Sequence, residues 1–293
     1  MKNYLIIGIA LITILSSCQE DIKVNLPSAG KKIVIEGNIE NGKFAELIIT
    51  RNKPLFSSIS STTLSDYMVL DAKVYVTNGI ITDTLSLSID SAASLPVVYQ
   101  GHSIIGIPGQ SYGLTVIADG KTYTSITTIP TPVPLDSVWF MLQPPNDSLG
   151  FAWARMTEPA GFGNGYKWSA KRATKDRRFI APYGATTDDK WVDGKTFDFY
   201  YYRGNDPTAP ATTDSQSDHE RGYYKIGDTI YVKFCSIDHA TTSFYETFEQ
   251  SVGTNGNPFA SPVTILGNIF SDGEEQLGIW AGYGATYDTI YAR

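Results

Sequence analysis

The sequence has little of what active sites need. Its 293 residues include two cysteines and three histidines, His102, His219 and His239. No two histidines lie at metal-ligand spacing, and neither a His-Glu-x-x-His nor a Gly-x-Ser-x-Gly motif occurs. The glycine-rich segments 161–165 and 282–284 do not lead from a strand into a helix, as a phosphate cradle requires, and we predict turns at both. These absences predict a non-enzymatic protein without a metal or a cofactor.

Basic residues are in the minority. The chain has 23 Lys and Arg against 30 Asp and Glu, a formal net charge of −7. Proteins that bind nucleic acid present a basic face to the phosphates, so this balance argues against a nucleic-acid partner. The hydrophobic content of 42% and the charged content of 18% are typical of a globular protein. The length allows two domains of ordinary size.

Long apolar runs are missing as well. Residues 4–15 form the only apolar run of note, and it is shorter than the ~20 residues that cross a bilayer. A short positive segment, Met1-Lys-Asn, precedes this run, and the small residues Ser16 and Ser17 follow it. This layout predicts a cleavable secretory signal peptide over residues 1–17.

The residues at the predicted cleavage site resemble a lipobox. Leu15-Ser-Ser-Cys18 is similar to the motif of bacterial lipoproteins, whose cysteine takes a diacylglyceryl thioether and becomes the mature N-terminus. Two or more acyl chains, palmitate among them, anchor a protein stably. The alternative is an ordinary signal peptide with an incidental cysteine. A lipidated Cys18 leaves Cys235 without a disulfide partner, and we predict that Cys235 is buried in a strand.

The residues after Cys18 predict to which membrane the lipoprotein is sorted. Gln19, Glu20 and Asp21 resemble the acidic signal that sends lipoproteins to the outer face of the outer membrane in one phylum of Gram-negative bacteria. We therefore predict a tether over residues 18–29 and a lipid anchor in the outer membrane on the cell-surface side. The periplasmic side remains the alternative.

The first hundred residues of the body predict β-hairpins. Asn41-Gly42, Asn78-Gly79 and Asp119-Gly120 each separate two runs rich in Val, Ile, Thr and Tyr, which is a strong hairpin pattern. Several short strands at this spacing predict a mainly β fold with an immunoglobulin-like β-sandwich over residues 30–130. The Cys–Trp–Cys core of antibody domains is missing, which excludes that branch.

A proline-rich segment follows the predicted sandwich. The prolines in Ile129-Pro-Thr-Pro-Val-Pro alternate, which favours an extended, semi-rigid connector, and we place a linker at residues 131–135. Residues 136–293 then form a second, β-rich domain. It includes one short helix, predicted over Thr241 to Val252 from aromatic and aliphatic residues at helical spacing.

Two segments of the second half are candidate interaction surfaces. The first is aromatic, and its residues are predicted to face a partner or ligand, with packing in the sheet as the alternative. The second is basic, and it is predicted to face an anionic partner or lipopolysaccharide phosphate, with a solvated strand–loop face as the alternative. The aromatic residues are Trp191, Phe197, Phe199, Tyr200, Tyr201 and Tyr202, and the basic residues are Lys171, Arg172, Lys175, Arg177 and Arg178.

A family resemblance rests on motifs spread along the chain. These are Val34-Ile-Glu-Gly-Asn-Ile, Asp228-Thr-Ile-Tyr-Val, Asn257-Pro-Phe, Ile265-Leu-Gly-Asn-Ile-Phe, Leu277-Gly-Ile-Trp and Gly282-Tyr-Gly. With the lipobox and the proline-rich joint, they resemble the lipoproteins of the domain of unknown function 4249 family over essentially the whole mature chain. The chain departs from the family pattern at Ser271-Asp-Gly-Glu-Glu-Gln, an acidic insertion in place of a glycine-rich link.

The resemblance implies an outer-membrane lipoprotein of that phylum, often encoded beside a TonB-dependent receptor. It supplies no catalytic residues. We therefore predict a non-enzymatic accessory that binds a TonB-dependent receptor or its substrate at the cell surface. A free-standing carbohydrate- or peptide-binding lipoprotein is the alternative, with residues 191–202 as its site.

Overall fold

The computed structural model describes residues 32–52, 64–89, 97–204, 220, 222–254, 261 and 263–293. Within these ranges the fold is mainly β, with sixteen strands and a single α-helix. Residues 31–293 form one compact unit. No helix in the described ranges is long and apolar enough to cross a membrane. The predicted signal peptide, Cys18, the tether, His219 and Asn257-Pro-Phe lie outside the described residues.

The strands alternate with short turns along most of the chain. Their bounds are β1 (Ile33–Glu40), β2 (Phe44–Arg51), β3 (Lys73–Thr77), β4 (Thr82–Ile89), β5 (Val97–Ile105), β6 (Ser111–Ala118), β7 (Lys121–Thr128), β8 (Ser137–Leu142), β9 (Leu149–Thr157), β10 (Gly165–Arg172), β11 (Thr186–Asp188), β12 (Thr196–Tyr201), β13 (Tyr224–Lys225), β14 (Thr229–Ile237), β15 (Ile269–Ser271) and β16 (Glu274–Tyr291). A 3₁₀ helix, η1 (Leu64–Tyr67), precedes β3, and the helix α2 (His239–Thr254) follows β14.

The three predicted hairpins are confirmed. Antiparallel pairing joins β1 to β2, β3 to β4 and β6 to β7 across the Asn-Gly, Asn-Gly and Asp-Gly turns. Gly42, Gly79 and Gly120 have φ values of 76°, 86° and 74°, and Asp119 has a φ of 49°. The two Asn-Gly connections are longer and place only the glycine in the left-handed region. The two-residue connection between β6 and β7 has both Asp119 and Gly120 there, as a type I′ turn requires. The acidic insertion after β15 forms a turn of the same kind, with positive φ at Asp272 and Gly273.

Nine strands form a closed ring, in the order β1-β2-β5-β4-β3-β6-β7-β15-β16, and β16 pairs with β1 to complete it. The prediction of a separate immunoglobulin-like sandwich is therefore wrong. The edge strands β7 and β1 pair with β15 and β16 from the end of the chain. Such pairing is expected, because an unpaired strand edge must find a partner or be protected. The same sheet continues beyond β16 through β14, β10 and β11.

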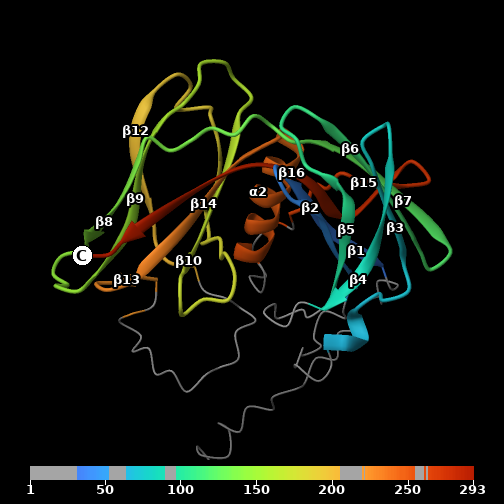
Figure 1. Cartoon of the computed structure of the whole chain (residues 1–293), viewed down its shortest axis with the longest axis horizontal. Coiled ribbons are helices and arrows are strands. Elements are labelled where there is room, and N and C mark those ends of the chain that lie inside the picture. Colours follow the sequence, from blue (N-terminus) through green and yellow to red (C-terminus); the bar gives the residue numbers. More distant parts are fainter. Residues whose placement is uncertain are drawn as a thin grey trace, which may run out of the picture. The chain divides into compact units, whose positions relative to one another are not determined.

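Strand β16 pairs with strands from both halves of the sequence. Its first half pairs in parallel with β1, with Val34 opposite Leu277 and Glu40 opposite Tyr283. Its second half pairs antiparallel with β14, from Gly284 to Tyr291. In Figure 1 this strand, drawn in red, runs from β15 to the side of β14. Residues 278–283 are all buried, so no alternation of polar and apolar residues marks them as a strand.

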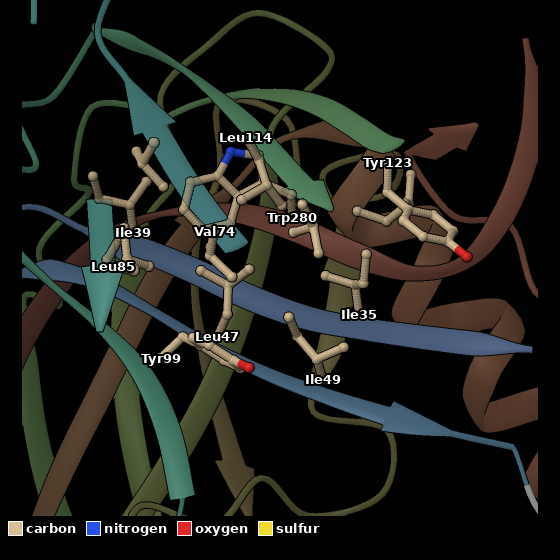
Figure 2. Close-up of a cluster of buried hydrophobic side chains, with 14 of the residues drawn as sticks. Ile35, Ile39, Leu47, Ile49, Val74, Leu85, Tyr99, Leu114, Tyr123 and Trp280 are labelled. Atoms are coloured by element: carbon tan, nitrogen blue, oxygen red, sulfur yellow. The ribbon is translucent and has the colours of Figure 1, made fainter. Parts of the chain in front are cut away.

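The first hydrophobic core fills the ring. It is built from inward-facing aliphatic residues of β1, β2, β3 and β6, and from Trp280 of β16. Figure 2 shows Trp280 beside Val74 and Leu114, with Ile35 below it. The indole Nε1 of Trp280 donates a hydrogen bond to the carbonyl oxygen of Tyr112 at 2.9 Å, so the buried polar atom is satisfied. The C-terminal strand is thus part of the N-terminal core.

The second core lies between two sheets. The small sheet has β9 at its centre, with β8 on one side and β12 and β13 on the other. Its inner face packs on β10 and β14 through alanines and aromatic rings. The buried members of this core include Ala152, Ala154, Met156, Tyr166, Trp168 and Phe234.

The proline-rich segment lies directly on β16. A Cβ added at Gly282 would meet the carbonyl oxygen of Thr128 at 2.5 Å, and one at Gly284 would meet that of Pro130 at 2.3 Å. The turn predicted at 282–284 is therefore wrong, since these glycines are within a strand and permit the close approach of another backbone segment. At residues 161–165 the predicted turn is confirmed, with positive φ at Gly161 and Gly163.

The predicted helix is confirmed and extends a little further at both ends. Asp238 precedes α2 as its N-cap, and its Oδ1 accepts a hydrogen bond from the amide of Thr241 at 2.8 Å. Phe244 packs on a small core with Ile237 and Ile279. The helix thus covers the face of β14 and β16 that points away from the small sheet.

Cys235 is buried within this small core, as predicted, and is 3% exposed. Burial raises the pKa of its thiol to about 11. At pH 8 we expect no reaction with a thiol reagent in the folded protein and full reaction in denaturant, because the thiolate is the reactive form. An absorbance assay with an aromatic disulfide reagent measures both, with Cys235→Ala as the control. Reaction of the native protein within minutes would contradict the buried placement.

Candidate functional site

The outer face of the small sheet carries a cluster of aromatic residues. Side chains of successive strand residues point to opposite faces, so each strand contributes alternate residues to the outside. Trp139, Trp153 and Tyr200 form a row across β8, β9 and β12, since they are paired in register. Met141 and Phe151 form the next row, and Tyr223 stacks on Phe151. We call this surface the aromatic face: Trp139, Met141, Phe151, Trp153, Tyr200 and Tyr223.

The rings of the aromatic face pack on one another. The Trp153 and Tyr200 centroids are 4.7 Å apart, those of Phe151 and Tyr200 are 5.0 Å apart, and those of Trp139 and Trp153 are 6.0 Å apart. Such contacts add about 0.5–1.5 kcal/mol per pair beyond area burial. Tyr200 is still 48% exposed, and Met141 is 43% exposed. The result is a preformed apolar patch on the surface.

An ion pair borders the aromatic face. The guanidinium of Arg155 donates two hydrogen bonds to the carboxylate of Asp198, at 2.6 and 2.8 Å. The hydrogen bond from Arg155 lowers the pKa of Asp198 below its usual range. The next row holds the contact of Thr157 Oγ1 with Asp136 at 2.8 Å. The apolar patch therefore has a polar rim on this side, as protein interfaces have.

The six aromatic residues predicted from the sequence do not form one surface. Tyr200 lies on the aromatic face. Phe197, Phe199 and Tyr201 point inward and pack on the second core. Tyr202 follows β12, and its hydroxyl donates to the carbonyl oxygen of Tyr183 at 2.8 Å. Trp191 is 78% exposed, on a loop before β12.

Sequence reasoning missed most of the aromatic face. Trp139, Phe151 and Trp153 come from β8 and β9, for which the sequence analysis predicts no role. The sequence does carry an indication of this face. β8 and β9 are apolar at consecutive positions, whereas a strand that buries only one face alternates apolar and polar residues. What the sequence did not show is that β8 and β9 flank β12.

The basic segment does not form an open cationic surface. Arg172 is buried and makes two side-chain hydrogen bonds to Asp176, at 2.7 and 3.0 Å. Burial opposes the charge of Asp176, but the hydrogen bonds from Arg172 hold its pKa below the usual range. Lys175 pairs with Asp228 at 2.7 Å. Lys171 lies over the ring of Phe179. Of the five basic residues, only Lys175 and Arg177 are exposed.

Three carboxylates that the sequence did not single out lie within 4.8 Å of one another. They belong to Glu158, Asp189 and Asp193, in the loops before β10 and before β12. Each accepts hydrogen bonds from the facing loop: Glu158 from Gly194 N at 2.7 Å, Asp189 from Gly163 N at 2.8 Å, and Asp193 from Gly161 N at 2.6 Å. The carboxylates therefore tie the two loops together.

Glu158 offers a direct test of this link, because it is 1% exposed. Changing Glu158 to Gln should lower the free energy of unfolding by about 1–3 kcal/mol. The NH₂ group that replaces one carboxylate oxygen would face a donor and lose that hydrogen bond. Urea unfolding followed by circular dichroism measures the change. The control is Glu274→Gln at an exposed site, for which no change is expected. Equal stability of the two variants would contradict the proposed role.

The chain was compared with known proteins. No protein-family model matches it, and no curated protein matches it. The resemblance to the domain of unknown function 4249 family therefore stays a prediction from sequence motifs.

Proposed function

We propose that this protein is a non-enzymatic accessory lipoprotein, anchored in the outer membrane through Cys18 on the cell-surface side, that binds a TonB-dependent receptor. The observation that supports the proposal is the aromatic face. Its Trp and Tyr residues, with Arg155 at the rim, are the residue types that dominate binding energy in protein interfaces. The lipid anchor and the family resemblance supply the choice of partner.

The packing of the rings favours a protein partner over a sugar. Carbohydrates bind by stacking on the free face of an aromatic ring. Phe151 stacks on both Tyr200 and Tyr223, at interplanar angles of 26° and 24°, so its ring is engaged by two neighbouring rings. A patch of rings packed on one another with a methionine beside them suits an apolar protein surface, because the two surfaces can exclude water from the contact.

The anchor brings the face within reach of an integral membrane protein. Cys18 is fourteen positions before Lys32, where the described body begins, so the backbone between them spans at most roughly 50 Å. Confinement to the membrane raises the effective concentration of the body near a partner in the same membrane. A weak interface then suffices for stable association.

The test is a crosslinked pull-down of the tagged, lipidated protein from outer membranes, with mass spectrometry of the recovered proteins. We expect a TonB-dependent receptor in stoichiometric amount. Intact mass of the purified protein checks the anchor, as cleavage before Cys18 and lipid addition change it together. Recovery of the protein alone would overturn the receptor assignment.

A further inference from the structure

A cavity of about 680 Å³ lies where the proline-rich segment crosses the end of β14. This volume is within the range of small-ligand and peptide sites. One wall is the segment Pro130 to Pro134, and the opposite wall comes from the loop 159–165 and the residues that lead into α2. The aromatic face does not line it. The cavity is therefore a second place at which this protein can bind something.

The lining has few hydrogen-bond donors left. Pro130, Pro132, Pro134 and Pro159 line the cavity and have no N–H. The amide of Val133 already donates to Ser236 Oγ at 3.1 Å, and the amide of Asp136 donates to the carbonyl oxygen of Arg155 at 2.8 Å.

The polar side chains of the lining are engaged in the same way. The hydroxyl of Thr157 donates to Asp136 at 2.8 Å, and the amide group of Asn164 donates to Glu158 at 2.7 Å. Donors that are engaged with the protein cannot serve a ligand. The side-chain donors that remain in the lining include those of Thr131, Ser236 and His239.

The acceptors carry negative charge. Asp136, Asp238 and His239 line the cavity, and no Lys or Arg is among its lining residues. The carboxylate of Asp238 also accepts hydrogen bonds from the amide of Thr241 at 2.8 Å and from Thr127 Oγ1 at 3.2 Å, so a ligand would share its oxygens with these donors. Arg155 interacts electrostatically with Asp136, but its guanidinium is held by Asp198. A smaller neighbouring cavity of about 100 Å³ shares Gly163, Asn164 and His239 with the first and adds Asp188, Asp189 and Glu246.

The two cavities together define a negative groove with apolar walls. Burial and the nearby charge of Asp188 raise the pKa of Glu246, which also feels His239 and Lys190 with the opposite effect. Proline rings, Val133 and Ile237 supply the apolar surface. A ligand that fits must bring donors and positive charge at one point and aliphatic groups beside it.

We propose that this groove binds a peptide segment through an arginine or lysine side chain. The cationic head would reach Asp136 and Asp238, and the methylenes of its stem would lie on the proline rings, as long basic side chains do on apolar surfaces. The proposal is independent of the aromatic face. The segment can come from a free peptide or from a loop of the membrane partner, and the chemistry is the same.

Calorimetric titration with short peptides tests the proposal. The probe is acetyl-Ala-Arg-Ala-amide, and its uncharged isostere has citrulline in place of arginine. We expect the arginine peptide to bind about tenfold or more tightly than the citrulline peptide, because a hydrogen bond to a charged group is lost. Equal affinity of the two peptides, or no measurable binding of either, would overturn the proposal.

Two variants locate the site. Asp136→Asn removes one charge and keeps an acceptor for Thr157, and it should weaken binding of the arginine peptide about tenfold. Thr131→Trp fills the cavity from an exposed position and should abolish binding of both peptides. Glu46→Gln, on β2 and remote from the groove, makes the same charge change as Asp136→Asn and should leave binding unchanged. An Asp136→Asn affinity equal to that of Glu46→Gln would place the ligand elsewhere.

The source of the segment follows from the pull-down. If Asp136→Asn weakens both peptide binding and recovery of the receptor, the segment belongs to the receptor. If peptide binding falls and receptor recovery does not, the ligand is a free peptide. A substitution in the aromatic face that abolishes receptor recovery leaves the groove unchanged. The receptor proposal and the peptide proposal can therefore fail independently of each other.

Discussion

The lipidated protein carrying Tyr200→Glu is expected to lose its receptor in the crosslinked pull-down. Tyr200 lies at the centre of the aromatic face and contacts both Phe151 and Trp153. A carboxylate there would have to leave water when the partner covers the face. Changes at the centre of an interface cost about 2–4 kcal/mol, which corresponds to roughly 30- to 1,000-fold in affinity. Recovery of the receptor by mass spectrometry is the measurement.

The matched control is Trp191→Glu. It makes the same charge change at another exposed aromatic residue, which is outside the aromatic face. We expect full recovery of the receptor with this variant. The reverse result, with loss at Trp191 and none at Tyr200, would move the interface to the loops tied by Glu158, Asp189 and Asp193. Unfolding curves for both variants exclude a loss caused by misfolding.

Gly278→Ala is expected to have the largest effect on stability. Gly278 pairs with Ile35 where β16 closes the ring, and its φ is +130°. A Cβ at this position would lie 1.9 Å from the carbonyl oxygen of Ile35. Neither the backbone conformation nor the space admits a side chain, so we expect a loss of about 4 kcal/mol or more, or failure to fold. The free energy of unfolding in urea measures it.

Gly113→Ala is the control for this change. Gly113 is in β6, and a Cβ there would meet only the methyl group of Thr77, at 3.1 Å. The side chain of Thr77 can move slightly, so we expect a change within about 1 kcal/mol. Similar stability of the two variants would show that the parallel pairing of β1 with β16 does not hold the ring closed.

The local elements of this protein were predictable from the sequence. The Asn-Gly and Asp-Gly turns need left-handed backbone, which few residues adopt, so they define their hairpins. Phe244 and Phe248 in α2 recur at helical spacing, and Asp238 caps the helix that they predict. The burial of Cys235 followed from its place in an apolar strand. Each of these features depends on residues that are close in the sequence.

The assembly of these elements was decided by the tertiary structure. The pairing of Val34 with Leu277 joins residues at opposite ends of the body, and no local pattern encodes such a contact. Both faces of β16 are buried near Trp280, so the alternation that identifies a strand is missing. The sandwich prediction was wrong for this reason, although the mainly β fold is confirmed.

The candidate sites depend on the same long-range pairing. Tyr200 belonged to an aromatic segment that the sequence singled out, but Trp139 and Trp153 join it only because β8 and β12 both pair with β9. The cavity likewise forms only because the prolines cross β14. Sequence alone determined which residues of a strand share a face, since that follows from the geometry of a single strand. Which outward residues become neighbours is a property of strand order, and hydrogen bonding between distant segments sets that order.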